Sequence, residues 1–405
     1  MSTITNLPVM MIGACVALML IALVPPSQAE PVPVEGIDEV EFDSPMTVIN
    51  SAELKIVRQR IKDGEEPQAT AYRRLIEDAE AAQEFIPEPP ARMTIMGGYQ
   101  AGSNLSEMRA LMRRESEAAY SSALAWLYSG ERRYAEKATE VLDAWAKADT
   151  RFSGHDAGLQ LGSWFTRLLY AADIMKSYDG WPEEAREEFE QWWRRRALPL
   201  VRREMVRRDN NWKDAGVLGV LAAAVVFEDR ELLGEALAEL NSYFLARRTR
   251  VSNPGENWKF AVHETGAVYF PREVTRRGRD IGPGGRGLTY TAYTLTTLVQ
   301  ALEIARYAGY DWWDREAENG ATMKEAIAAY IRWMDLGEDF PWHKEPYRYD
   351  SDGPRRNPHE IANNHFPGEI DGLKEWLEKH RPVNGRQGDP YVTLNRGNVP
   401  PQQKP

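Results

Sequence analysis

The chain has 405 residues and 43% of them are hydrophobic, so it is long and apolar enough to bury a sizeable core in one or two domains. Its net charge of −11 and isoelectric point near 5.3 argue against binding nucleic acid or an anionic membrane through general electrostatics. Any site for an anionic ligand must therefore be a local cluster of basic side chains.

Residues 1–29 carry no charged side chain and contain an apolar run that ends at Pro25 and Pro26. Ser27 and Ala29 supply the small residues of a cleavage site, so we expect a signal peptide over 1–29 that is removed after Ala29. The alternative is an uncleaved N-terminal membrane anchor. Cleavage predicts a secreted or periplasmic protein with no stable membrane insertion.

The only cysteine, Cys15, lies within this leader. Cleavage would leave a mature chain with no disulfide, no thiol nucleophile and no cysteine metal site. The six histidines include no closely spaced pair, so the sequence predicts no zinc site, and we expect neither a metal nor a cofactor.

After the leader, the proline-rich and acidic residues 30–50 predict an extended lead-in. A helical hairpin follows over 118–145, where apolar residues recur at helical spacing on both sides of the turn Ser129-Gly130-Glu131. Further amphipathic segments lie near 70–86, 156–179, 183–208, 213–228, 230–247, 286–309 and 319–336.

Alternating strand patterns are scarce, so the fold class is all-α. Eight or more helices in successive hairpins suggest a solenoid or an (α/α) toroid, an incomplete barrel of helical hairpins. The absence of a repeat of fixed length favours the toroid. We place the toroid at 51–385 and a C-terminal tail at 386–405.

Residues 250–285 form a loop rich in glycine, proline and arginine that is too long for a simple connector. Five arginines lie in or directly after its second half: Arg272, Arg276, Arg277, Arg279 and Arg286. The planar guanidinium binds carboxylates through two parallel hydrogen bonds, so the cluster fits an acidic ligand. The alternative is a solvated basic loop.

The segment 286–309 carries an arginine and two phenols on one stripe. At about 100° per residue, Arg286, Tyr290 and Tyr293 share a face. The opposite, packing face is formed by Leu288, Leu295, Leu298, Val299 and Leu302. A nearby positive charge lowers the pKa of a phenol, so this stripe suits proton transfer by tyrosine. The alternative is the wetter side of an ordinary amphipathic helix.

These residues resemble the alginate lyase family, especially the periplasmic polymannuronate lyases. That family has an Asn-Asn-His motif opening a helix and, later, a stretch resembling R-A-L-x-Y-H-N-Y-A-L. This chain has R-G-L-T-Y-T-A-Y-T-L at 286–295 and D-N-N-W at 209–212, and the similarity spans roughly residues 100 to 315. The resemblance implies an all-α toroid that cleaves an acidic polysaccharide, with alginate favoured, by β-elimination.

The resemblance also assigns roles. Tyr293 would remove the C5 proton of a uronate and return a proton to the leaving oxygen. Asn211 and Arg286 would neutralise the uronate carboxylate. The substrate-binding candidates are Asn210, Trp212, Tyr290, Arg277, Arg279, His365 and Trp164.

One departure from the family is Trp212, which stands where the motif has histidine, and a second is Pro283, where some relatives have one. Trp212 would stack on a sugar ring or pack in the core. A histidine in use must come from elsewhere, and the candidates are His263, which we include among the catalytic residues, His365 and His155. Without the motif histidine, one tyrosine serving as base and acid favours syn elimination, on mannuronate or glucuronate.

Other functions stay open at this point. The chain would act on glucuronan or another uronate polymer, or be a non-catalytic helical carbohydrate-binding protein. A glycoside hydrolase on the same fold would need paired carboxylates, for which the candidates are Asp214, Glu264, Glu273 and Asp280.

Overall fold

A computed structural model describes residues 31–245, 258–274, 286–342, 356–383 and 387–402 of the chain. The predicted signal peptide, Pro283 and Asp280 lie outside the described residues. Within them, no helix is both long and apolar enough to cross a membrane. The helices are α1 (Ser51–Asp63), α2 (Gln68–Gln83), α3 (Leu105–Ser129), α4 (Arg132–Ala148), α5 (Ala157–Ser163), α6 (Arg167–Met175), α7 (Glu183–Arg196), α8 (Leu198–Arg207), α9 (Asn211–Val226), α10 (Arg230–Asn241), α11 (Pro271–Val274), α12 (Gly287–Tyr307), α13 (Met323–Asp335), α14 (Asn357–His365), α15 (Leu373–His380) and α16 (Val392–Arg396).

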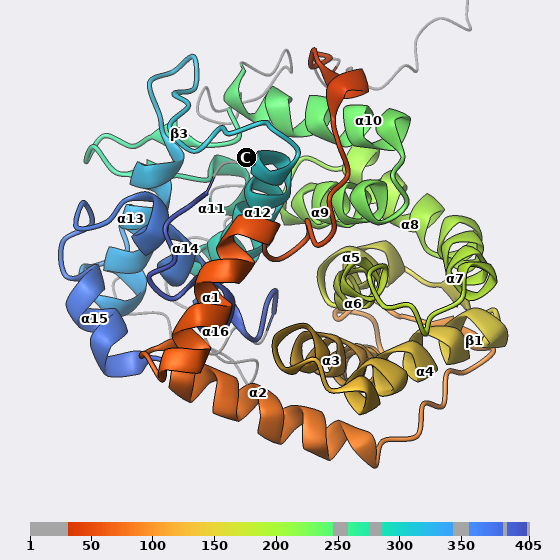
Figure 1. Cartoon of the computed structure of the whole chain (residues 1–405). Coiled ribbons are helices and arrows are strands. Elements are labelled where there is room, and N and C mark those ends of the chain that lie inside the picture. Colours follow the sequence, from red (N-terminus) through yellow and green to blue (C-terminus); the bar gives the residue numbers. More distant parts are fainter. Residues whose placement is uncertain (1–30, 246–257, 275–285, 343–355, 384–386, 403–405) are drawn as a thin grey trace, which may run out of the picture.

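Successive helices follow one another round the molecule. In Figure 1 they run from α2 and α3 at the bottom, through α7 at the right and α10 at the top, to α13 and α15 at the left. The expected all-α toroid of helical hairpins is confirmed, and the predicted segments at 213–228, 286–309 and 319–336 correspond to α9, α12 and α13.

Two segments that were predicted as single helices are each divided. The segment 183–208 breaks between α7 and α8, where Pro199 in the first turn of α8 has no backbone N–H to donate to the preceding helix. The segment 156–179 breaks between α5 and α6, because the N–H groups of Trp164 and Phe165 both donate to the Gln160 carbonyl as α5 ends. Hydrophobic periodicity continues across both breaks and does not reveal them.

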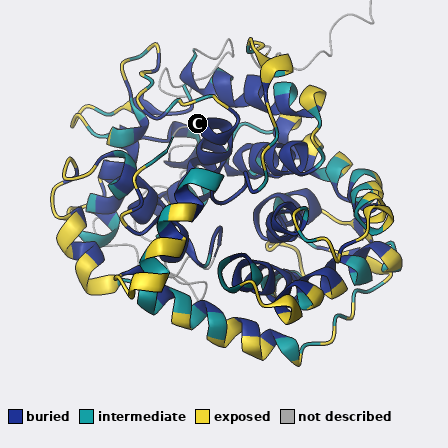
Figure 2. Cartoon of the chain, in the orientation of Figure 1, coloured by how far each residue is buried: buried dark blue, intermediate teal, exposed yellow. Residues whose placement is uncertain are grey.

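The centre of the fold consists of α9 and α12, and their burial identifies the site. Every residue of α9 is buried except Trp212. Every residue of α12 is buried except Tyr290 and Tyr293. Outer helices such as α2 and α15 carry exposed faces instead (Figure 2). The predicted packing face of α12 is confirmed: Leu288, Leu295, Leu298, Val299 and Leu302 are all buried.

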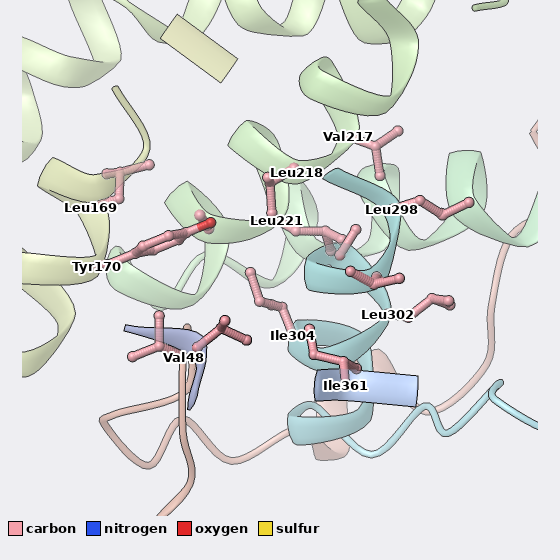
Figure 3. Packing of buried hydrophobic residues seen from close by; sticks show 14 of the residues in the cluster. Val48, Leu169, Tyr170, Val217, Leu218, Leu221, Leu298, Leu302, Ile304 and Ile361 are labelled. Carbon is pink, nitrogen blue, oxygen red and sulfur yellow. The ribbon is translucent and has the colours of Figure 1, made fainter. Parts of the chain in front are cut away.

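The hydrophobic core extends through most of the helices, and Figure 3 shows the part of it to which α6, α9, α12 and α14 contribute. Full burial of each such aliphatic side chain contributes roughly 1.5–3 kcal/mol to stability. Glycine lets the helices approach closely: a Cβ on Gly162 of α5 would lie 2.3 Å from the Ala215 carbonyl oxygen of α9. A Cβ on Gly216 would lie 2.4 Å from the backbone nitrogen of Met205 in α8. These contacts fix the start of α9 against α5 and α8.

Short strands join segments that are distant in sequence. Strand β1 (Arg92–Thr94) pairs in parallel with β2 (Arg151–Ser153), with Met93 opposite Phe152. This pairing sets the loop after β1 beside the start of α5. Strands β3 (Ala261–Val262) and β4 (Val268–Tyr269) form an antiparallel hairpin within the predicted long loop.

Both ends of the described chain are fastened to the helices. The lead-in contains a short 3-10 helix, η1 (Ile37–Glu39), and bends at Thr47. The N–H groups of Met46 and Thr47 donate to the Asp173 carboxylate at 2.7 and 2.8 Å. The sequence places a C-terminal tail at 386–405. The described residues 387–402 instead contain α16 and pack against the other helices. Arg396 of α16 is buried and forms an ion pair with Glu53 of α1 at 2.7 Å. A helix this short has too few turns to show periodicity in the sequence.

Candidate active site

A cleft of about 830 Å³ opens at the N-terminal ends of α9 and α12. Its walls are the loop before α3 with the first turns of α3, the helix α5 with its flanking residues, residues 208–215, α11, and the first turns of α12. This one cleft is lined by seven of the predicted site residues: Arg286, Tyr290, Tyr293, Asn210, Asn211, Trp212 and Trp164.

The first turns of α12 supply the arginine and the two phenols. Arg286 is the N-cap residue, and its carbonyl accepts the Tyr290 N–H at 2.9 Å. The Tyr290 and Tyr293 rings lie one helical turn apart, with centroids separated by 6.4 Å. The predicted stripe therefore faces the cleft, while the rest of the helix is buried.

Tyr99, from the loop after β1, meets this stripe across the cleft. Its phenol oxygen lies 2.6 Å from that of Tyr290 and accepts a hydrogen bond from Arg286 Nη1 at 3.2 Å. Sequence reasoning missed Tyr99, because it lies in a glycine-rich loop that has no periodicity and lies outside the recognised motifs.

The start of α9 supplies the asparagine pair. The Asn210 side chain caps the helix by accepting the Trp212 N–H at 3.3 Å, as is common at helix N-termini. Asn211, only 7% exposed, follows as the first residue of α9. The Trp212 ring is half-buried: the Arg208 guanidinium lies 4.4 Å from its centroid, and the His155 ring meets it edge-on at 5.2 Å. The Trp212 ring therefore packs against two protein side chains.

Among the residues that the structure describes, His155 is the histidine that lines the cleft. Its side chain is 54% exposed, and its Nδ1 lies 2.6 Å from Oδ1 of the buried Asp156. A carboxylate at this distance fixes the orientation of the ring and leaves Nε2 for another partner. Gly97 packs against it, since a Cβ there would lie 3.0 Å from His155 Nδ1.

The two histidines chosen from the sequence do not line the cleft. His263 lies in the β3–β4 hairpin, with Nδ1 2.9 Å from the Thr265 hydroxyl and its ring against Tyr269 and Trp342. His365 is buried at the far end of α12, where it is stacked on Trp313 at 4.0 Å and lies 2.6 Å from Glu303. The sequence analysis includes both histidines among the site residues, but the packing of the hairpin and of α14 holds their rings away from the described walls of the cleft.

Of the residues that the structure describes, four arginines lie in the walls of the cleft. Arg109, Arg208, Arg272 and Arg286 line it in a protein with a net charge of −11. Trp164 is nearly buried between the guanidinium groups of Arg109 and Arg167, which lie 5.9 and 5.8 Å from its ring centroid. Arg277 and Arg279 lie outside the described residues. The positive lining fits an anionic ligand.

Of the four carboxylates considered for hydrolysis, only Glu273 is among the cleft-lining residues that the structure describes. Burial raises the pKa of Glu273 to about 8, with nearby Lys259 opposing and Asp214 adding to the increase. Asp214 is buried in an ion pair with Lys259 at 2.6 Å, and Glu264 is exposed in the β3–β4 turn. No group of three histidine, cysteine or acidic side chains in the described segments is placed to hold a metal ion.

Comparison with solved structures supports the fold. No curated protein sequence matches the chain. Among solved structures, alginate lyase A1-III from Sphingomonas species A1 superposes with a TM-score of 0.64 at 18% identity, covering 90% of this chain and 99% of that one. A tyrosine-to-phenylalanine variant of the A1-III enzyme, complexed with a tetrasaccharide, gives 0.64 at 17% identity over 89% and 97%. An alginate lyase from Bacteroides ovatus gives 0.63 at 17% identity over 87% and 99%.

The model of the alginate lyase family matches residues 62–340, which is more than half of the chain. This range contains both motifs and every described wall of the cleft apart from Gln387. The chain therefore belongs to the alginate lyase family of polysaccharide lyases.

Proposed function

We propose that the protein cleaves alginate by β-elimination in this cleft, leaving a 4,5-unsaturated uronate at the new non-reducing end. The observation that carries the proposal is the convergence of Arg286 and Tyr293 from α12 with Asn211 from α9. The family membership and the arginine-lined walls support it.

The chemistry assigns a task to each of these side chains. Asn211 and Arg286 hydrogen-bond the uronate carboxylate, so that the negative charge developing at C5 spreads into a neutralised group. Tyr293, as phenolate, takes the C5 proton. The electron pair of the C5–H bond forms the C4–C5 double bond while the C4–O4 bond breaks, and the phenol returns its proton to O4.

His155 is the histidine that we place at the substrate. Asp156 holds its Nδ1, and its exposed ring lines the cleft beside Trp212. This arrangement suits a contact with a sugar hydroxyl or carboxylate, in a region where the family motif would supply its own histidine. His263 and His365 have no part in this mechanism.

A single tyrosine that acts as base and then as acid favours syn elimination. In mannuronate and glucuronate the C5 hydrogen and O4 lie on the same side of the ring, so Tyr293 can reach both. We therefore propose mannuronate-rich alginate as the preferred substrate, with glucuronan as the second polymer to test. Cleavage of the leader after Ala29 would deliver the enzyme to the periplasm or outside the cell, where such polymers occur.

The test is an ultraviolet assay of the purified mature chain with polymannuronate, polyguluronate and glucuronan. A lyase generates the absorbance of the unsaturated uronate, fastest with polymannuronate. A hydrolase releases reducing ends without that absorbance, and a binding protein releases neither. Either of the last two results would overturn the proposal.

A further inference from the structure

Glu273 has an unusual position for an acidic residue in a cleft that receives a polyanion. It lies on α11, lines the cleft and is only 2% exposed. The Asn211 N–H donates a hydrogen bond to its carboxyl group, and the Thr294 hydroxyl lies close to it. Its second oxygen, Oε1, is buried and has no hydrogen-bond partner among the residues that the structure describes.

The charges around Glu273 are already balanced without it. Lys259 and Asp214 form a buried ion pair at 2.6 Å, and Thr294 also donates to Asp214 at 2.8 Å. An ionised Glu273 would add a negative charge that this cluster does not neutralise, and an uncompensated buried charge is costly.

The other charged groups on the neighbouring elements are paired among themselves. Arg272, also on α11, lies 3.3 Å from Asp209, and Lys213 of α9 is paired with Glu239. On α12, Arg286 contacts Tyr99 at the opening of the cleft. The buried surroundings, with Asp214 close by, raise the pKa of Glu273 to about 8 despite Lys259, so the carboxyl group is protonated at neutral pH.

We propose that Glu273 binds substrate as a neutral carboxylic acid, donating a hydrogen bond from its carboxyl O–H to the carboxylate of the uronate that Asn211 and Arg286 hold. The Asn211 N–H donates to the carboxyl group, and no described residue accepts a proton from it, so the acid keeps its O–H for the substrate. Substrate binding then depends on this proton, because the ionised form loses the donor and repels the polyanion. This inference rests on the proposed function and adds a third donor to the carboxylate site.

Glu273→Gln is the decisive variant, because glutamine is close in size, stays neutral and keeps an N–H donor. Glu264→Gln, in the exposed β3–β4 turn, is the matched control. KM and kcat are measured with polymannuronate from pH 6 to 9.5, and direct binding of a saturated mannuronate tetrasaccharide is measured by calorimetry at pH 6.5 and 9.

We expect KM of the wild type and of Glu264→Gln to rise by up to about tenfold per pH unit above the pKa of Glu273, while kcat changes less. Glu273→Gln should keep kcat/KM within about tenfold of wild type at pH 6.5 and lack the alkaline rise of KM. Glu273→Ala, which has no donor, should bind at least about tenfold more weakly at pH 6.5.

Two results would overturn the inference. If Glu273→Gln binds normally but loses turnover at every pH, then a titrating carboxyl group is needed and Glu273 takes part in proton transfer. If Glu273→Gln keeps the alkaline rise of KM, another group controls binding. Should wild type bind the tetrasaccharide but form no unsaturated product from any polymer, the proposed function fails. The calorimetric comparison would still decide the role of Glu273.

Discussion

The phenol oxygens of Tyr99 and Tyr290 lie 2.6 Å apart, although 191 residues separate them in the chain. This contact spans the cleft from the loop after β1 to α12, and Arg286 donates to the same Tyr99 oxygen at 3.2 Å. A uronate carboxylate must therefore replace Tyr99 at Arg286 or bind to the other N–H groups of its guanidinium, which has five donors in total. Tyr293 lies one turn further into the cleft and is placed for the chemistry.

The first prediction concerns that tyrosine. Tyr293→Phe should leave the fold intact and lower kcat by at least about a hundredfold, because it removes the group that transfers the proton. Tyr290→Phe is the control: it loses the hydrogen bond to Tyr99 but no proton-transfer step, and should stay within about tenfold of wild type. Turnover close to normal in Tyr293→Phe would remove Tyr293 from the mechanism and make Tyr290 the next candidate.

A second prediction tests the carboxylate contact of Arg286. Methyl esterification removes the charge that Arg286 recognises, so the wild type should strongly prefer the free acid. Arg286→Ala should lose most of this preference as well as activity, since both substrates then lack the bidentate partner. The measurement is kcat/KM for esterified and free polymannuronate with both proteins. Equal discrimination by the two would assign Arg286 a structural role at the start of α12.

The sequence predicts much of this fold because the hydrophobic periodicity of α9, α12 and α13 is strong, and it predicts the site where a motif lies on one helix. Arg286, Tyr290 and Tyr293 share a face through local geometry alone. Tyr99, His155 and Glu273 reach the cleft only because the β1–β2 pairing and the packing of α11 on α12 bring distant segments together. Such contacts leave no periodic signal, so the sequence alone does not distinguish His155 from His263 and His365.

A third prediction separates these histidines. His155→Ala should lower kcat/KM by about ten- to a hundredfold, mainly through KM, because His155 contacts the sugar without moving the C5 proton. His263→Ala should remain within about tenfold of wild type, since its ring lies in the β3–β4 hairpin. Rates at several polymer concentrations give the two parameters. A collapse of kcat in His155→Ala with KM unchanged would instead assign proton transfer to this histidine.

The fourth prediction gives His365 a structural role. Burial alone would raise the pKa of Glu303, but Arg306, Arg396 and His365 hold it well below its usual value. His365→Ala removes one of these partners and the ring stacked on Trp313, so the free energy of unfolding should fall by about 1–3 kcal/mol. Urea denaturation measures the loss, and kcat/KM of the folded fraction should be unchanged. A loss of activity without a loss of stability would contradict this assignment.

The last prediction follows the proton on Glu273 through unfolding. The pKa of Glu273 is about 8 in the folded chain and about 4.3 in an unfolded one, so unfolding between these values releases a proton. Stability from this group is fully present below the unfolded pKa and is lost as pH rises towards 8, by up to about 1.4 kcal/mol per pH unit. Glu273→Gln has no such proton. It should therefore unfold at nearly the same temperature as wild type at pH 5 and at a higher temperature at pH 8, whereas Glu264→Gln should follow wild type at both. Thermal unfolding by circular dichroism provides the comparison. Identical pH dependence in wild type and Glu273→Gln would mean that Glu273 is ionised throughout, with Lys259 neutralising it more strongly than its burial opposes the charge.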